Sequence, residues 1–335
     1  MAKIVCFGEL LLRLTAPGRE LVMQSGQLDV HVGGAEANVA VALARLGHES
    51  AMLSRVPDNA LGDAATGYLR RYGVDASQVS TGPGRMGLYF LSVGAGLRAS
   101  EIIYDREGSS FGLAGPADFD WGKALNGADL LHLSGITPAL GARSAELAIA
   151  AAEAAAASAI AISFDGNYRA QLWQRWDSNP REILSRLVGQ AEIFFGNHRD
   201  ISLLLGQEFG GGGEHRRRAS AEAVFEAFPK LKLIASTARL MDDADRHRIS
   251  ARIDTREGSA QTEEVTVAGI VDRIGAGDAF AAGVLHGVRL GRDLDWTVRA
   301  GLALSCLKHS LPGDAALFAA KDIEAFMGGE LDVRR

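Results

Sequence analysis

Hydrophobic and polar positions follow two alternating patterns along the chain, and these patterns predict most of its elements. Short apolar runs rich in β-branched residues are separated by longer runs rich in alanine and leucine, which is typical of a parallel sheet covered by helices on both faces. Two helices are expected at residues 35–46 and 142–157. Core strands are expected at residues 4–7, 130–134, 160–165, 193–196 and 233–236. The chain is therefore predicted to have an α/β fold with a mostly parallel central sheet flanked by helices.

Two further segments, residues 13–32 and 87–106, interrupt this rhythm. They contain stretches in which apolar residues alternate with others, so they are expected to form hairpin strands outside the main sheet. A glycine-rich motif at residues 82–87 matches the G-x-G-x-x-G pattern of dinucleotide-binding folds. Because Pro83 and the strand that follows make this motif a turn into a hairpin, a nicotinamide site is not expected there. The chain contains no Walker A sequence.

Composition and charge narrow the class of protein. The 335 residues are 47% hydrophobic and 23% charged, which is ordinary for a globular protein. The net charge of −6 argues against general nucleic-acid binding, and the one basic cluster, residues 215–218, is expected to lie in a solvated loop. Cys6 and Cys306 each lie in an apolar run, so they are expected to be buried thiols of a reducing compartment. With no signal-peptide pattern and no apolar run of membrane-spanning length, the expected location is the cytoplasm, without a membrane partner.

One segment, residues 271–283, combines the features of an active site. Gly275 and Gly277 allow a tight turn whose backbone N–H groups point inward, and a helix beginning near Ala276 would aim its positive end at an anion. Asp278 would lie in the first turn of that helix, where a carboxylate beside a bound phosphate can take a proton from an attacking hydroxyl. The alternative is an ordinary helix start with an acidic first turn, since acids are favoured there in any helix.

A second glycine-rich segment lies far upstream. Gly33 and Gly34 are followed by Asn38 and by an alanine-rich helical run. Together with residues 271–283, this segment resembles the two signatures of the ribokinase or PfkB family of carbohydrate kinases. The resemblance extends from residue 3 to about residue 325.

This resemblance implies a fold and a set of cofactors. The family fold has three layers, with a small β-sheet lid that closes over the sugar. Here the lid would comprise about residues 12–32 and 86–109 of one ribokinase-like kinase domain at residues 1–330. The family uses ATP and Mg²⁺, and whether a monovalent cation also binds at the Asp272 turn is left open by the sequence.

Polar residues between the two signatures bear on the acceptor. Tyr104 and Arg106 are two positions apart on an expected strand, so their side chains share a face. Asp165, Asn167 and Arg169 follow the third core strand, at the edge of the sheet where α/β folds bind ligands. Two arginines at one crevice suit a carboxylate, because a guanidinium group makes a planar, two-pronged contact with it. The alternatives are an exposed arginine at a sheet edge and an ordinary strand-ending turn.

These segments resemble one branch of the family, the 2-keto-3-deoxygluconate kinases. The most telling match is Asp-Arg-x-Gly-Ala-Gly-Asp at residues 272–278. This branch implies transfer of the ATP γ-phosphoryl group to the terminal hydroxyl of 2-keto-3-deoxygluconate, which gives 2-keto-3-deoxy-6-phosphogluconate. A kinase for another hexose, ketose or nucleoside is the nearby alternative. A catalytically idle sugar-binding regulator is the alternative from a different class.

The resemblance also implies roles for individual residues. Asp278 would be the general base, and a backbone anion hole would come from Gly275, Ala276 and Gly277. The sugar would be bound by Gly33, Gly34, Asn38, Tyr89, Tyr104, Arg106, Ile136, Arg169 and Asp314. The nucleotide would be bound by Asn197, Ser236, Thr237 and Arg239 together with Gly275 and Gly277.

The chain departs from the family pattern in two places. Where the family has Asn-x-x-Glu, this chain has Asn197 and Asp200. Since Mg²⁺ keeps its waters, the shorter Asp200 is expected to hold the metal indirectly. The glycine-rich stretch that many relatives show near ATP is missing at residues 236–243.

The expected partners are a small sugar acid, ATP and a second copy of the chain. Leu88, Phe90 and Val93 lie on a lid strand whose outer face could pair between subunits. A homo-oligomer formed through the lid is therefore expected, without nucleic acid or membrane.

Overall fold

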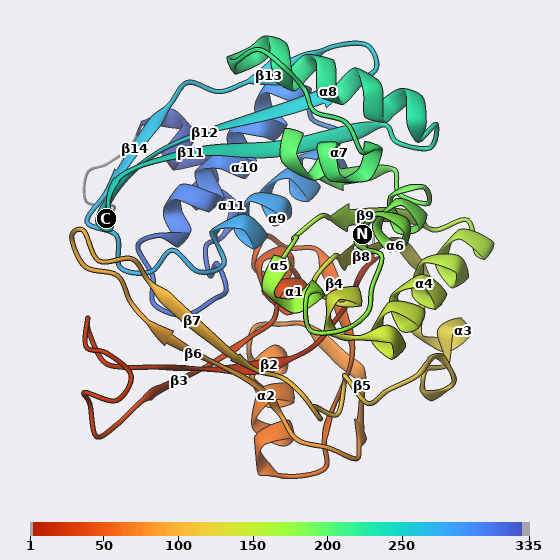
Figure 1. Ribbon diagram of the computed structural model, residues 1–335, viewed down its shortest axis with the longest axis vertical. Coiled ribbons are helices and arrows are strands. Elements are labelled where there is room, and N and C mark those ends of the chain that lie inside the picture. The colour runs from red at the N-terminus through yellow and green to blue at the C-terminus, as the bar shows by residue number, and fades with distance from the viewer. Residues whose placement is uncertain (1–2, 330–335) are drawn as a thin grey trace.

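The computed structural model describes residues 3–329, and its largest feature is a ten-stranded sheet (Figure 1). Its strands are β1 (Lys3–Phe7), β4 (Glu49–Pro57), β5 (Asp75–Gly82), β8 (Ala128–Ser134), β9 (Ala161–Asp165), β10 (Ile193–Phe195), β11 (Leu233–Asp243), β12 (Arg246–Thr255), β13 (Ser259–Gln261) and β14 (Val265–Ala268). Their order is β13-β12-β11-β10-β9-β8-β1-β4-β5, with β14 paired to β12. The pairs from β11 to β5 are parallel, whereas β12 runs antiparallel to its three neighbours. The mostly parallel sheet confirms the predicted fold class.

The five predicted core strands coincide with β1, β8, β9, β10 and β11. One of them is longer than expected, because β11 continues to Asp243 and forms a hairpin with β12. Beyond Ser236 most side chains of β11 are exposed, so this extension carries no buried apolar pattern by which it could be predicted.

A smaller, separate sheet has the order β3-β2-β6-β7. Its strands are β2 (Leu11–Thr15), β3 (Asp29–Gly33), β6 (Gly87–Ser92) and β7 (Glu101–Asp105). They include the hairpin strands expected outside the main sheet. Tyr89 and Leu91 face inward, and Val93 packs with them. The expectation that Val93 shares the outer face with Leu88 and Phe90 is therefore wrong, because side chains alternate along a strand and Val93 has the opposite parity.

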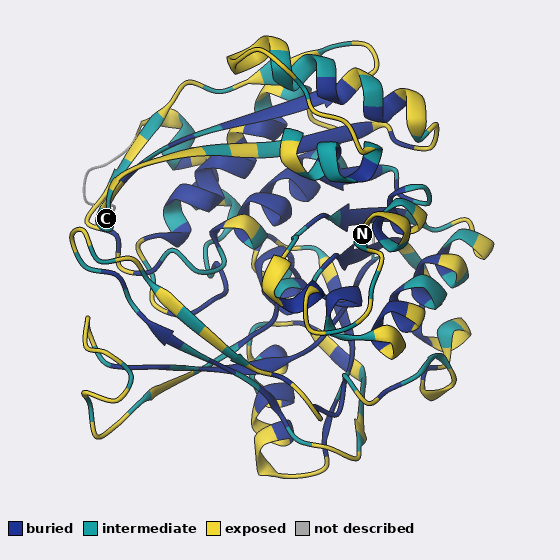
Figure 2. Cartoon of the chain, in the orientation of Figure 1, coloured by how far each residue is buried: buried dark blue, intermediate teal, exposed yellow. Residues whose placement is uncertain are grey.

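Helices cover both faces of the large sheet, as the alternation along β1 shows. Ile4 and Cys6 pack into one core cluster, whereas Val5 and Phe7 pack into another on the opposite face. The strands in the middle of the large sheet are buried, and the exposed residues gather on the outer sides of the flanking helices (Figure 2). The first cluster contains α1 (Ala35–Arg45), α2 (Ala60–Arg71), α9 (Ala276–Arg289), α10 (Leu294–Lys308) and α11 (Ala320–Gly328). The second contains α3 (Trp121–Ala124), α4 (Ala142–Ala157), α5 (Ala170–Trp173), α6 (Pro180–Val188), α7 (His198–Leu205) and α8 (Gly213–Ala227). The three layers follow from this division.

Two smaller expectations have different outcomes. Cys6 and Cys306 are buried and unpaired, as predicted. Residues 215–218, which were expected in a loop, lie instead on α8. The helix is stabilised there because Arg218 pairs with Glu222 one turn later and with Asp254 of β12.

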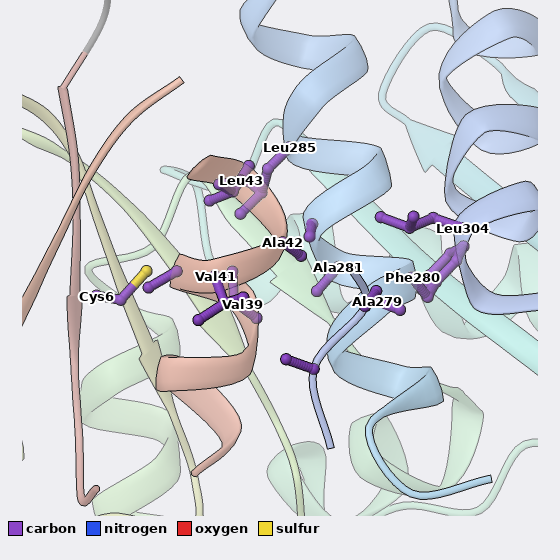
Figure 3. Packing of buried hydrophobic residues seen from close by; sticks show 14 of the residues in the cluster. Cys6, Val39, Val41, Ala42, Leu43, Ala279, Phe280, Ala281, Leu285 and Leu304 are labelled. Atoms are coloured by element: carbon purple, nitrogen blue, oxygen red, sulfur yellow. The ribbon is translucent and has the colours of Figure 1, made fainter. Parts of the chain in front are cut away.

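The helices that carry the two glycine-rich signatures lie side by side. In Figure 3, Leu43 of α1 lies near Leu285 of α9, and Ala42 lies near Ala281. Both helices begin on the same side of the large sheet, at the carboxyl ends of its parallel strands. The two glycine-rich segments, which are separated by most of the chain, therefore come together at the carboxyl ends of the parallel strands.

Candidate active site

A cleft of about 810 Å³ opens where the parallel strands end, between the large sheet and the smaller one. Its lining includes residues at or just after the ends of β8, β9 and β10, residues of β11, the start of α9, and side chains from β2, β6 and β7. Every residue predicted to act in catalysis or to bind sugar, nucleotide or metal lines this cleft, with the exception of Gly33. Gly33 lies just beside it: a Cβ atom there would be 2.2 Å from Oδ2 of Asp314.

The turn before α9 provides backbone donors at the centre of the cleft. Gly275 has a φ of 80°, and a Cβ atom there would lie 1.7 Å from the carbonyl oxygen of Asp314, so only glycine fits. The N–H of Ala276 was expected to be free for an anion, but it donates to the carbonyl of Arg273 at 3.3 Å. Within residues 3–329, the N–H groups of Gly275, Gly277 and Asp278 have no protein acceptor. They lie at the positive end of a 14-residue helix, where an anion is favoured.

Asp278 lies beside these donors and is held by the other signature. The Nδ2 of Asn38 donates to its Oδ2 at 2.7 Å, which joins α1 to α9. Burial, together with the charges of Asp165, Asp314 and Glu36, raises the pKa of Asp278 to about 8, although the hydrogen bond from Asn38 opposes this. A carboxyl group with such a pKa is suited to exchange a proton near neutral pH.

Asp314 organises the side of the cleft next to the smaller sheet. The hydroxyl of Tyr89 donates to its Oδ2 at 2.6 Å, and Nη1 of Arg13 lies 2.9 Å from its Oδ1. Burial raises the pKa of Asp314, although the positive charge of Arg13 opposes this. Gly34, with a φ of 139°, brings the start of α1 against the backbone of Glu9, where a Cβ atom would be 2.3 Å from the carbonyl oxygen.

The two arginines expected to meet a carboxylate differ in their surroundings. Arg106 is buried and its Nε donates to Oε2 of Glu9 at 2.5 Å, so its charge is already neutralised by a buried acid. Arg169 is exposed at the cleft, and its Nη1 donates a hydrogen bond to the carbonyl oxygen of Tyr168 at 3.2 Å. Among the described residues, Arg169 has no ion-pair partner within 4 Å. Of these two arginines, Arg169 is thus the one that an incoming anion can reach.

Two further arginines line the opposite end of the cleft. Arg239, on the β11 extension, lies close enough to Arg273 that burial and this positive neighbour both lower its pKa. In the part of the chain that the structure describes, neither guanidinium has an acid partner. Ser236 and Thr237 precede Arg239 along the same strand and also face the cleft. Uncompensated guanidinium groups beside free N–H donors suit a polyphosphate.

Asp165 at the end of β9 and Asp200 in the first turn of α7 are the acids of the cleft that could hold Mg²⁺. Asp200 accepts a hydrogen bond from the N–H of Asn197 through Oδ2 at 2.8 Å, which caps α7 and leaves Oδ1 available. Asp165 also lines the cleft, and its pKa is raised to about 6 by burial, against the positive charge of Arg169 and with the help of the charge of Asp200. Two carboxyl groups of this kind fit a Mg²⁺ ion that keeps most of its waters and also binds phosphate. No group of three or more potential metal ligands occurs within residues 3–329.

Several of these residues could not be identified from the sequence. Arg13 is surrounded by leucines on a strand, yet it is only 1% exposed and also pairs with Asp272 at 2.7 Å. Glu9 and Lys308 give no motif signal, because their partners are distant in the chain. Arg273 belongs to the signature itself, so its position in the cleft could have been expected from its neighbours.

Comparison with known proteins places this cleft in context. Residues 1–319 match the model of the pfkB family of carbohydrate kinases. The 2-dehydro-3-deoxygalactonokinase of Haloferax volcanii is 30% identical over 335 residues, which cover 100% of this chain and 99% of that protein. The crystal structure of 2-dehydro-3-deoxygluconokinase from Thermotoga maritima superposes with a TM-score of 0.93 at 35% identity, over 98% of this chain and 100% of the other. The 2-dehydro-3-deoxygluconokinase of Bacillus subtilis is 29% identical, over 84% of this chain and 82% of its own.

None of the helices described for residues 3–329 is long and apolar enough to cross a membrane. The match to the family covers nearly the whole chain, and the residues of both signatures meet in the cleft. This chain therefore belongs to the pfkB family of carbohydrate kinases, and it is a sugar kinase.

Proposed function

We propose that the enzyme transfers the γ-phosphoryl group of ATP to the terminal hydroxyl of 2-keto-3-deoxygluconate. The observation that carries this proposal is the exposed, unpaired Arg169 in the same cleft as Asp278 and the free N–H groups of the α9 turn. A sugar acid supplies the carboxylate that Arg169 lacks. Relatives named for 2-dehydro-3-deoxy sugar acids support the same substrate class.

In the proposed reaction, Asp278 accepts the proton of the attacking hydroxyl. A bond forms between that oxygen and the γ-phosphorus, while the bond from the γ-phosphorus to its bridging oxygen breaks and ADP leaves. The N–H groups of Gly277 and Asp278 would donate hydrogen bonds to the γ-phosphoryl oxygens and so stabilise their negative charge during transfer. Mg²⁺ supplies charge neutralisation on the phosphates when bound, and Asp165 and Asp200 would hold it through water.

The nucleotide and sugar would occupy different ends of the cleft. Arg239 and Arg273, with Ser236 and Thr237, would hold the ATP phosphates in place of a glycine-rich loop. Tyr104, Arg169 and Ile136 would surround the keto-acid end of the sugar. The smaller sheet would act as the lid of a single kinase domain. The cytoplasmic location expected from the sequence stays a prediction.

The test is ADP release with a panel of acceptors, using Asp278→Asn as the blank. The panel contains 2-keto-3-deoxygluconate, its C4 epimer, fructose, ribose and adenosine. We expect selective turnover of the keto acids and at least a hundredfold lower rate of phosphoryl transfer in Asp278→Asn. This variant should fold normally, because its amide oxygen can still accept the hydrogen bond from Nδ2 of Asn38. Preference for the C4 epimer would move the assignment to the substrate in the name of the Haloferax relative.

A second measurement tests the acid site. Arg169→Gln should raise KM for the keto acids about tenfold or more, since a charged contact of this kind is worth about 1.5–3 kcal/mol. Any slow turnover of fructose should be unaffected. A neutral sugar as the preferred acceptor, or an unchanged KM in Arg169→Gln, would contradict the carboxylate assignment. Thermal stabilisation by the sugar without ADP formation would favour a non-catalytic binding protein instead.

A further inference from the structure

Lys308, the last residue of α10, is completely buried behind the turn that precedes α9. Its exposed fraction is 0%. The ammonium group donates to the carbonyl oxygens of Asp272 at 3.2 Å and of Leu311 at 3.0 Å. Lysine is rarely buried without a partner of opposite charge, because removing its charge from water is unfavourable. The surroundings of Lys308 must therefore compensate that charge.

Asp272 is the centre of these surroundings, and its carboxylate is fully engaged. Oδ1 accepts the N–H of Ile274 at 2.9 Å. Oδ2 pairs with Nη2 of Arg13 at 2.7 Å and accepts the N–H of Gly313 at 3.1 Å. Asp272 thus joins the turn before α9 to the loop after α10, and the ammonium group of Lys308 links the same two segments through the carbonyl oxygens of Asp272 and Leu311.

The charges at this junction balance. Arg13 and Lys308 supply two positive charges, and Asp272 and Asp314 supply two negative ones. Burial lowers the pKa of Lys308, while Asp272 and Asp314 oppose that effect. A monovalent cation at the Asp272 turn would find the carboxylate and the main-chain oxygen already taken by donors, and it would add an uncompensated charge. The residues present do not fit such an ion.

We propose that the ammonium group of Lys308 is an internal cation that holds the α9 turn in its working shape, so that turnover needs no monovalent ion. Lys308 does not line the cleft, and it acts as a positioning residue. By drawing the Asp272 and Leu311 carbonyls together, it keeps Gly275 against the backbone of Asp314. The free N–H groups of Gly277 and Asp278 keep their direction as a consequence. This inference rests on the proposed role of that turn in phosphoryl transfer.

The first measurement is the ion dependence of the unmodified enzyme. At constant ionic strength, kcat should stay within twofold when tetramethylammonium chloride is replaced by NaCl, KCl or NH₄Cl. A rise of more than fivefold with K⁺ would overturn the proposal, whether or not any variant folds.

The second measurement uses two variants. Lys308→Ala removes the ammonium group and leaves space, so kcat should fall at least tenfold with the sugar KM within threefold. NH₄⁺ should then restore kcat at least threefold and raise the melting temperature. Lys308→Met fills the space without a charge, so it should lose kcat but show no response to NH₄⁺. Unchanged kcat in folded Lys308→Met, or absence of both ammonium effects in folded Lys308→Ala, would contradict the proposal.

The readouts separate this inference from the proposed function. Asp278→Asn keeps Lys308 and should show no ammonium effect on either residual rate or melting temperature. If the unmodified enzyme turned over none of the acceptors, the proposed function would fail. The effect of NH₄⁺ on the melting temperature of Lys308→Ala would still show whether a cation belongs at this junction.

Discussion

At the scale of single residues, the cleft keeps an unusual number of acids close together. Burial raises the pKa of Asp278, and the charges of Asp165, Asp314 and Glu36 add to this effect. Glu36 itself has a pKa raised to about 7 by burial, although it accepts hydrogen bonds from the hydroxyls of Ser134 and Thr137. Raised pKa values mean that the enzyme without ligands carries fewer negative charges here at neutral pH. This reduces the repulsion that a polyphosphate meets on entry.

The raised pKa of Asp278 leads to a prediction about pH. Because the carboxylate form is the base and predominates only above about pH 8, kcat/KM for the sugar should rise about tenfold per unit from pH 6 toward pH 8 and then level off. Initial rates at saturating ATP and Mg²⁺ across pH 5.5–9.5, buffered at constant ionic strength (~0.1 M), measure this. The residual activity of Asp278→Asn should lack the same rise. A flat profile of kcat/KM between pH 6 and 8 would contradict Asp278 as the base.

At the scale of elements, the start of α9 uses its two glycines for different purposes. Gly275 adopts a left-handed conformation against the backbone of Asp314, whereas no atom lies within 4 Å of a Cβ placed on Gly277. Gly277 is instead exposed toward the cleft. One glycine is required by the fold, and the other leaves room for a ligand.

The matched substitutions should therefore behave differently. Gly275→Ala should lower the melting temperature by several degrees or prevent folding, because both the backbone conformation and a contact at 1.7 Å are unfavourable. Gly277→Ala should fold with an unchanged melting temperature but lose at least tenfold in kcat/KM for ATP, since its methyl group would occupy the phosphate position. Thermal melts and initial rates of both variants check this. Equal effects of the two substitutions on stability would be inconsistent with the separate roles.

The sequence predicted this element well and others poorly, for physical reasons. Residues 271–283 combine local signals, glycines followed by an acid and an apolar helical run, so both the turn and α9 could be predicted. The antiparallel extension of β11 is exposed and polar, and therefore carries no periodic signal. Arg106 shows a third case: its position at the cleft was predictable, but its pairing with Glu9 depends on a contact 97 positions away. Long-range ion pairs leave no mark in one sequence.

At the scale of the whole molecule, the smaller sheet has an apolar row on its outer face. Val30, Leu14, Phe90 and Ile103 are paired in register across all four strands. Val30 is 58% exposed and Ile103 is 52% exposed, so both ends of the row are open to solvent. The expected oligomer would bury this row against the same row of a second copy.

This leads to a prediction about the oligomeric state. The enzyme should be a dimer in light scattering at micromolar concentration. Ile103→Asp should be a folded monomer at the same concentration, with a melting temperature similar to that of the unmodified enzyme. Leu290→Asp is the matched control, because Leu290 is 49% exposed at the end of α9, away from the row. Leu290→Asp should stay dimeric. A monomer in the unmodified enzyme at that concentration would remove the proposed pairing.

The hydrogen bond between Asn38 and Asp278 spans 240 positions of the chain. During synthesis, Asn38 leaves the ribosome long before α9 exists, so α1 has no catalytic partner while most of the large sheet is being made. With Asp278 as the proposed base, proton transfer would begin only after α9 has emerged and packed beside α1. A nascent or prematurely ended chain that contains most of the strands would therefore be inactive, and the cell would meet an active kinase only once α9 is in place.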